Sequence, residues 1–165
     1  MGLLPGCLWV SAAKSSTPLK REHTLNTEPI TITPDFVWPK PDDNGNRTLA
    51  NGAVIGPDAV IGRCAIIGQR AVIGPSAVIK QYVSIGRGAV IGRGASIEQD
   101  AVIGPNAVIG SSAVIGQYAT IGQYVSIGPN AVIEHDATIG QGARIERHAR
   151  WIACVGFADG YYKDL

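Results

Sequence analysis

Apolar residues return every six positions along most of the chain, a period that fits neither an α-helix nor an ordinary alternating strand. Each six-residue unit holds a small apolar residue, usually Ala, and an Ile two positions later. Sixteen such isoleucines follow one another between Ile55 and Ile145 without an insertion. Because residues two apart on a strand point the same way, every unit predicts one short strand with two side chains in a common core.

The residues between these strands have turn chemistry. A Gly usually follows the Ile, and the next two positions are drawn mostly from Pro, Asp, Asn, Ser, Gln, Arg and Gly. Strands and turns this short cannot stack as hairpins at a constant period, but they can wind as a coil in which each strand pairs with its copy one turn away. The six-residue spacing of the Ile positions continues to Leu49 at one end, and at the other end Trp151 and Phe157 occupy Ile positions. We therefore expect an all-β protein.

The unit Ile-Gly-x-x-Ala-x resembles the hexapeptide repeat of the bacterial transferase family. The resemblance implies a left-handed parallel β-helix with three units, or eighteen residues, in each triangular coil, and about six coils in this chain. The handedness comes from the resemblance alone, because general topology rules favour right-handed crossovers. The predicted organisation is a tail over residues 1–48, a β-helix over 49–160 and a C-terminal end over 161–165.

The N-terminal tail, which is mostly irregular, holds six of the ten prolines and no six-residue unit. The run ITIT at 30–33 predicts one short strand that Pro34 ends. The open end of a β-helix exposes unpaired strand edges. We expect Phe36, Val37 and Trp38 to cover that end, and residues 1–25 to be partly disordered. The aromatic residues expected to close the other end are Trp151, Phe157, Tyr161 and Tyr162.

Composition argues against several classes of function. The net charge of +1, with 16% charged residues, speaks against an electrostatic nucleic-acid binder. No apolar run reaches the length of a membrane span, so no membrane partner is expected. Three cysteines do not make a disulfide framework. A cytoplasmic location is therefore the expectation.

The residues between Ala and Ile point outward, and every eighteenth residue stacks in a column. Two adjoining faces carry columns of valine, which together form an apolar patch of the kind that marks contacts between proteins. Enzymes with this repeat are typically trimers packed side by side, so the resemblance implies a homotrimer. The predicted interface residues are Val54, Val72, Val90 and Val108 on the first face and Val60, Val78, Val114 and Val132 on the second.

The edge that follows the second face departs most from the repeat. Lys80 and Glu98 replace Gly one coil apart, and we expect them to form an ion pair, which contributes little if it is exposed. Three glutamines one coil apart should form an amide ladder, as stacked strands allow. They are Gln81, Gln99 and Gln117. The least repetitive chemistry of the chain is thus predicted to gather on this edge.

One segment of this edge, AVIEHDATIG at residues 131–140, resembles the Glu-His-Asp segment of sugar O- and N-acyltransferases with this fold. The resemblance implies that His135 is the general base for an acceptor hydroxyl or amine and that Asp136 orients it. Imidazole suits this role because it titrates near neutral pH. The resemblance also implies acyl-CoA as the donor substrate and a small-molecule acceptor. No other cofactor is implied.

Two alternatives remain open at this stage. In the related enzymes several coils follow the histidine and hold the pantetheine arm of coenzyme A, whereas about one coil follows His135 here. A non-catalytic scaffold or partner-binding β-helix, or a shortened relative of the enzymes, is therefore one alternative. The other is metal-dependent hydration by three histidines, as in carbonic anhydrases built on this helix. His23 lies in the tail, and His135 and His148 fall on different edges, so no metal site is predicted.

Overall fold

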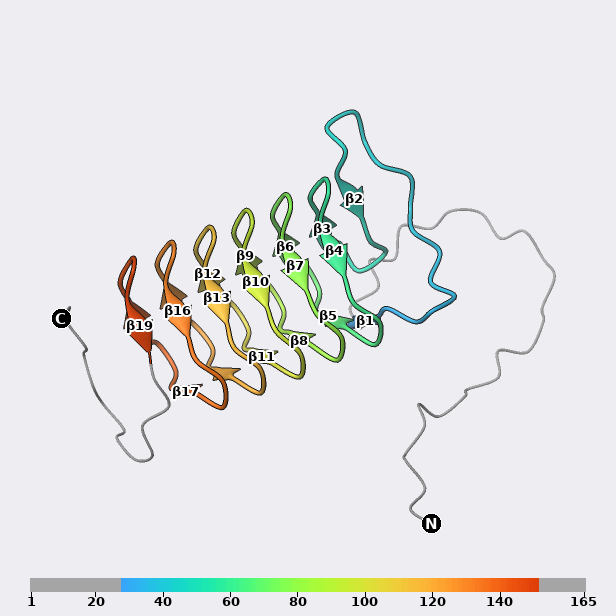
Figure 1. Ribbon diagram of the computed structural model, residues 1–165. Helices are drawn as coiled ribbons and strands as arrows, with labels where there is room; N and C mark the ends of the chain where they lie inside the picture. Colours follow the sequence, from blue (N-terminus) through green and yellow to red (C-terminus); the bar gives the residue numbers. More distant parts are fainter. Residues whose placement is uncertain (1–27, 152–165) are drawn as a thin grey trace, which may run out of the picture.

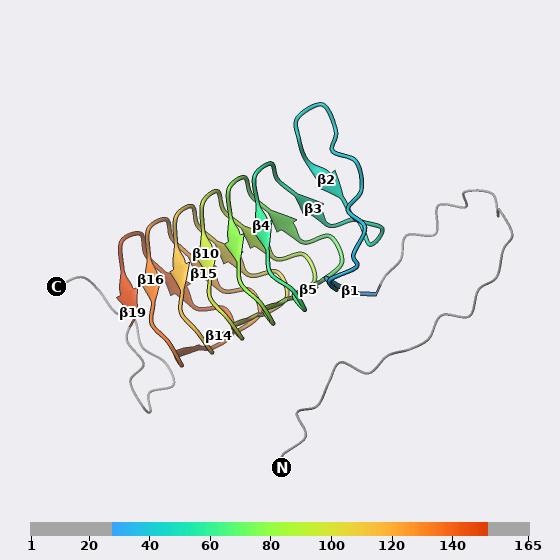
Figure 2. The same cartoon turned by 45° about the vertical axis from the view of Figure 1, so that its right-hand side comes forward.

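Short strands one coil apart stack into three sheets, which form the sides of a prism (Figures 1 and 2). The computed structural model describes residues 28–151 of the 165 in the chain. Within that range every regular element is a two-residue strand, as the alternation of Ala and Ile predicts. The prediction of an all-β protein is confirmed.

The strands are grouped here by the face that they form. The first face contains β2 (Arg47–Thr48), β3 (Val54–Ile55), β6 (Val72–Ile73), β9 (Val90–Ile91), β12 (Val108–Ile109), β15 (Ser126–Ile127) and β18 (Arg144–Ile145). The second face contains β4 (Val60–Ile61), β7 (Val78–Ile79), β10 (Ser96–Ile97), β13 (Val114–Ile115), β16 (Val132–Ile133) and β19 (Arg150–Trp151). The third face contains β1 (Ile30–Thr31), β5 (Ile66–Ile67), β8 (Ser84–Ile85), β11 (Val102–Ile103), β14 (Thr120–Ile121) and β17 (Thr138–Ile139).

Successive coils pair in parallel with a constant shift of eighteen residues. Ile97, for example, lies between Ile79 and Ile115 on the second face. Two faces hold six parallel strands each and the third holds five, so the coil completes between five and six turns. Followed from the N-terminal end, it winds with a left hand (Figure 1). The left-handed parallel β-helix that the hexapeptide resemblance implies is confirmed.

The core is built from two residue types in alternation. Ala or Val takes one inward position of each unit and Ile takes the other, and from Ala65 to Ile139 all of them are buried. Twelve isoleucines, Ile67 to Ile133, expose less than 2% of their surface. Burying a side chain of that size contributes about 1.5–3 kcal/mol. Because this contribution recurs in every unit, strands of only two residues are stable in this fold.

Glycine after each Ile is required by the close approach of the next coil. A Cβ placed on Gly104 would lie 2.6 Å from the backbone nitrogen of Gln123 and 2.6 Å from the carbonyl carbon of Gly122. These atoms belong to the backbone of the neighbouring coil, so they cannot turn aside as a flexible side chain would. The recurrence of glycine therefore reflects the distance between coils.

Replacing Gly104 by Ala should destabilise the fold by about 1–3 kcal/mol, the usual cost of overpacking that moves backbone. The matched control is Gly140→Ala, because no atom of the described residues lies within 4 Å of the Cβ that it would add. We expect that variant to lie within about 0.5 kcal/mol of the unmodified protein. Urea denaturation followed by circular dichroism measures both. Equal losses in the two variants would contradict the steric role of the glycines.

Two short antiparallel strands close two of the three sheets at the N-terminal end. β1 pairs with β5 and β2 pairs with β3, and the buried Ile32 and Leu49 extend the core there. The buried side chain of Asn51 takes the place of missing backbone partners. Its Nδ2 donates to the Ile67 carbonyl at 2.9 Å, and its Oδ1 accepts from the Ala53 amide at 3.1 Å. The strand predicted within 30–33 is thus confirmed in part, as β1.

The aromatic plug is confirmed for two of its three residues. Phe36 and Trp38 pack against the core, with ring centroids 4.9 Å apart in an edge-on arrangement. Including Val37 was wrong, because its side chain is 87% exposed. Side chains alternate along an extended segment, so the residue between two inward-facing aromatics faces water. At the other end Trp151 takes the Ile position beside Ile133 and is half-buried against the core, as predicted.

Several predictions concern residues outside the described range. They are the partial disorder of residues 1–25 and the closing role of Phe157, Tyr161 and Tyr162. The division of the chain into segments 1–48, 49–160 and 161–165 also stays a prediction.

Candidate functional site

The polar edge lies in the turns that join the second face to the third. The last residue of each of these turns has a left-handed backbone, with φ of 57° at Cys64, 61° at Tyr82, 58° at Asp100, 59° at Tyr118 and 58° at Asp136. Residues other than glycine adopt this conformation at a cost. Because it recurs in every coil of the described range, equivalent side chains form straight columns along the prism.

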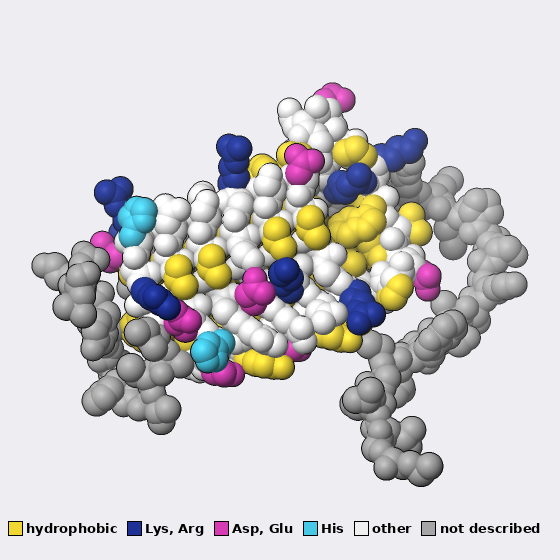
Figure 3. Space-filling model, viewed as in Figure 1, with side chains coloured by type: hydrophobic (Ala, Val, Ile, Leu, Met, Phe, Trp, Pro, Cys, Tyr) yellow, Lys and Arg dark blue, Asp and Glu magenta, His cyan; other side chains and the backbone are white. Residues whose placement is uncertain are grey.

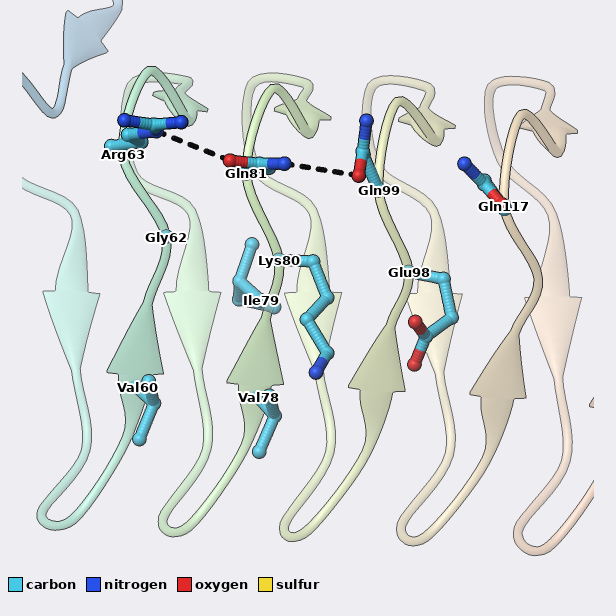
Figure 4. Close-up of a pocket in the computed structure, with 10 residues that line it drawn as sticks. All are labelled: Val60, Gly62, Arg63, Val78, Ile79, Lys80, Gln81, Glu98, Gln99 and Gln117. Carbon is cyan, nitrogen blue, oxygen red and sulfur yellow. Dashed lines mark hydrogen bonds between the residues drawn. The ribbon is translucent and has the colours of Figure 1, made fainter.

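The amide ladder is confirmed for two of its three glutamines. Nε2 of Gln81 donates to Oε1 of Gln99 at 3.0 Å, and Nε of Arg63 extends the row by donating to Oε1 of Gln81 at 3.2 Å (Figure 4). The row stops at the next coil, because Nε2 of Gln99 donates to Oδ2 of Asp100 at 2.8 Å. Including Gln117 was therefore wrong: a carboxylate within the same turn takes the amide that would have bonded to it.

The predicted ion pair between Lys80 and Glu98 does not form. Oε1 of Glu98 instead accepts the hydroxyl of Ser96 at 3.0 Å. Between side chains of residues 28–151, the ion pair that does form joins Glu134 and Arg150, with Oε1 and Nη2 separated by 2.6 Å. Lys80 and Glu98 both line a groove of about 610 Å³ that opens on the second face below the amide row (Figure 4).

His135 and Asp136 lie side by side in the turn between β16 and β17, and both side chains are exposed. The Asp136 amide donates to the Gln117 carbonyl at 2.9 Å, which ties this turn to the preceding coil. Within the described residues, no hydrogen bond joins the imidazole of His135 to the carboxylate of Asp136. Glu134, the acid on the other side of His135, is held by Arg150 in an ion pair.

The remaining histidine of the described range lies elsewhere. His148 is exposed in the turn between β18 and β19, which joins the first face to the second. His23 falls outside the described residues. Over residues 28–151, no three His, Cys, Asp or Glu side chains gather closely enough to hold a metal ion.

The eight predicted interface valines all have side chains that reach the surface. Val72, Val90 and Val108 are exposed on the first face, and Val60 and Val114 on the second. The other three, Val54, Val78 and Val132, are half-buried. On the face seen in Figure 3, a basic and an acidic side chain interrupt the apolar ones. Ser96 breaks the second column between Val78 and Val114, whereas the first column holds four valines in succession, Val54 to Val108.

The chain belongs to the bacterial transferase hexapeptide family. The family model, described as bacterial transferase hexapeptide (six repeats), matches residues 48–81, 82–117 and 118–150, which together make up more than half of the chain. The resemblance on which the fold prediction depended is thereby confirmed. No curated protein sequence matches the chain.

Solved structures with the same fold include two acetyltransferases. PerB from Caulobacter crescentus, solved with CoA and GDP-perosamine, is 21% identical with a TM-score of 0.58, covering 61% of this chain and 48% of its own. The acetyltransferase domain of PglB from Neisseria gonorrhoeae FA1090, solved with acetyl coenzyme A, is 22% identical with a TM-score of 0.53, covering 56% and 47%. At these identities the likeness shows the fold alone. This chain spans about half the length of either structure.

The described residues contain no helix long and apolar enough to cross a membrane.

Proposed function

We propose that the protein is an acyltransferase that moves an acyl group from acyl-CoA to the amine or hydroxyl of a small acceptor such as a sugar. One observation supports this most: His135 is exposed on the polar edge with a free carboxylate next to it, in a chain of the hexapeptide transferase family. The solved relatives fit the proposal, since one was solved with CoA and a sugar nucleotide and the other with acetyl coenzyme A.

The chemistry assigns one role to each of two side chains. The imidazole of His135 accepts the proton of the acceptor N–H or O–H as that atom attacks the thioester carbonyl. The bond between the carbonyl carbon and sulfur then breaks, and the imidazolium returns the proton to the leaving thiolate. Asp136 orients the ring and stabilises its positive charge. Glu134 is already bonded to Arg150 and is not needed for this step.

We further propose that the protein is a homotrimer whose chains pack through the valine columns of the first and second faces. An apolar surface of this kind favours contact with a neighbouring chain. Such packing would bring a second chain beside the polar edge, and the acyl-CoA arm would then lie between two chains. A cytoplasmic location suits an enzyme that uses acyl-CoA.

Calorimetry with acetyl-CoA on the purified protein tests the proposal. We expect saturable binding with about one donor per chain, in an assembly that sedimentation shows to contain about three chains. Transfer to a panel of amino sugars and sugar alcohols should follow, and free CoA thiol should appear in equal amount. A monomer that binds no acetyl-CoA and transfers no acyl group would favour the non-catalytic scaffold.

A further inference from the structure

Three residues break the repeat at one place on the second face. Lys80 and Glu98 occupy the position after Ile, which holds Gly in twelve of the sixteen units and Glu in two others, Glu134 and Glu146. Ser96 interrupts the outward valine column between Val78 and Val114. The three positions belong to two successive coils, and the Ser96 hydroxyl donates to Oε1 of Glu98 at 3.0 Å. At these neighbouring positions, polar or charged residues therefore stand where the repeat usually has Gly or Val.

A side chain after Ile is sterically unfavourable in the middle of the helix. At Gly62, one coil before Lys80, an added Cβ would lie 2.5 Å from the backbone nitrogen of Gln81. At Gly116, one coil after Glu98, it would lie 2.5 Å from the carbonyl carbon of Glu134. Lys80 and Glu98 carry such a Cβ, so the coils beside them must move slightly apart.

The backbone hydrogen bonds from these two residues to the next coil are slightly longer than those from the neighbouring glycines. The amides of Lys80 and Glu98 donate to the next coil at 2.9 Å, whereas those of Gly62 and Gly116 do so at 2.7 Å. The turn bonds change in the same direction. The Asp100 amide reaches the Gln81 carbonyl at 3.3 Å, where the equivalent bond from Asp136 measures 2.9 Å. The two charged residues are thus accommodated with the hydrogen bonds between coils intact.

The two charges do not neutralise one another in an ion pair. Their side chains run in the same direction over the second face, and they line a groove of about 610 Å³ together with Val60 and Val78 (Figure 4). Because both valines also belong to the proposed trimer interface, a ligand in this groove and a neighbouring chain on these two valines exclude one another. Glu98 is half-buried and fixed by Ser96, while Lys80 is exposed. The groove therefore offers one cation and one anion, about one coil spacing or 5 Å apart along the prism.

We propose that this groove binds a small zwitterion, with the anionic group of the ligand on Lys80 and its ammonium group on Glu98. The fitting ligands carry a phosphate or carboxylate and an amine separated by about one coil spacing. The amides of Gln81 and Gln99 form the rim and supply neutral hydrogen-bonding groups. The site is distinct from the proposed catalytic turn, because His135 lies two coils beyond Gln99, about 10 Å along the edge.

Titration of the isotope-labelled full chain by NMR with O-phosphoethanolamine tests this proposal. Its two halves, ethanolamine and ethyl phosphate, serve as singly charged probes. We expect amide signals around residues 80 and 98 to move with the zwitterion and to saturate. Each half should bind about fivefold more weakly, the most that one exposed charge contact usually contributes. Equal binding of all three compounds, or of none, would overturn the proposal.

Substitutions assign the two ends of the ligand. Lys80→Met should weaken binding of the zwitterion and of ethyl phosphate but leave ethanolamine unchanged. Glu98→Gln should show the reverse pattern. Lys40→Met and Glu146→Gln remove exposed charges elsewhere and should leave all three affinities unchanged. If Lys80→Met or Glu98→Gln altered only the sedimenting mass, the pair would be a contact between copies and the proposal would be wrong.

Discussion

The Ile103→Ala protein should unfold with a free energy about 2–5 kcal/mol lower than that of the unmodified protein. Ile103 is 1% exposed and lies between Ile85 and Ile121 in its column. Removing most of its side chain leaves a cavity. The coils cannot close over that cavity, because backbone hydrogen bonds set their spacing on all three faces. The loss therefore combines the transfer of apolar groups to water with the cost of an unfilled space.

The neighbouring residue provides the control for this experiment. Val102 points outward on the third face, away from the proposed interface, and is 43% exposed. Val102→Ala should cost clearly less, within the small range typical of surface changes. Urea denaturation should be followed by two independent probes, because repeat proteins can lose all-or-none unfolding. If both substitutions cost the same, the division into inward and outward residues does not describe the folded protein.

The parts of the fold that follow from periodicity could be predicted residue by residue. The spacing of Ala and Ile by two and of the units by six predicts inward Ile side chains that stack from coil to coil, and the three units per coil that the family resemblance implies then predict which residues lie side by side. The observed register, with Val54 beside Val72 and Ile55 beside Ile73, is the predicted one. The handedness of the helix could not be predicted from the spacing, because left-handed and right-handed coils have the same spacing. It came from the resemblance to the family and is confirmed.

The interactions on the polar edge could be predicted only in part. Equivalent positions one coil apart were expected to bond to each other, and Gln81 and Gln99 do so. Competition within a single coil decided the others: Asp100 takes the amide of Gln99, and Ser96 takes the carboxylate of Glu98. Comparing equivalent positions in successive coils does not reveal these contacts, because Ser96 and Asp100 belong to the same coil as the residues they bond to.

The N-terminal cap shows a second limit of prediction from the repeat. Phe36 and Trp38 were found because aromatic residues next to an open end have few other places to be buried. The strand β2 and the buried Asn51 were not predicted. The sequence did contain an indication of the role of Asn51. An Asn side chain at the start of the repeat, just after Leu49, can form the hydrogen bonds that missing backbone partners would otherwise form. The open edges of a first coil need such partners as much as they need apolar cover.

Replacing His135 by Asn should lower the rate of acyl transfer about 10²–10⁴-fold if the imidazole is the general base. Asparagine is similar in size and polar but cannot take up the acceptor proton. Because His135 is exposed in a turn, the fold and its stability should be unchanged. Circular dichroism and urea denaturation check this. Binding of acetyl-CoA should also persist, so the loss should appear in kcat and not in donor affinity.

Two further variants separate a catalytic role from a change in surface charge. His148→Asn removes the other exposed histidine, at a φ of 60° that asparagine tolerates, and should leave the rate unchanged. Asp136→Asn keeps the shape of the carboxylate but not its charge, so it should cause a partial loss. Equal rates in His135→Asn and the unmodified protein would show that His135 is not the general base, since no other histidine of the described range lies on this edge.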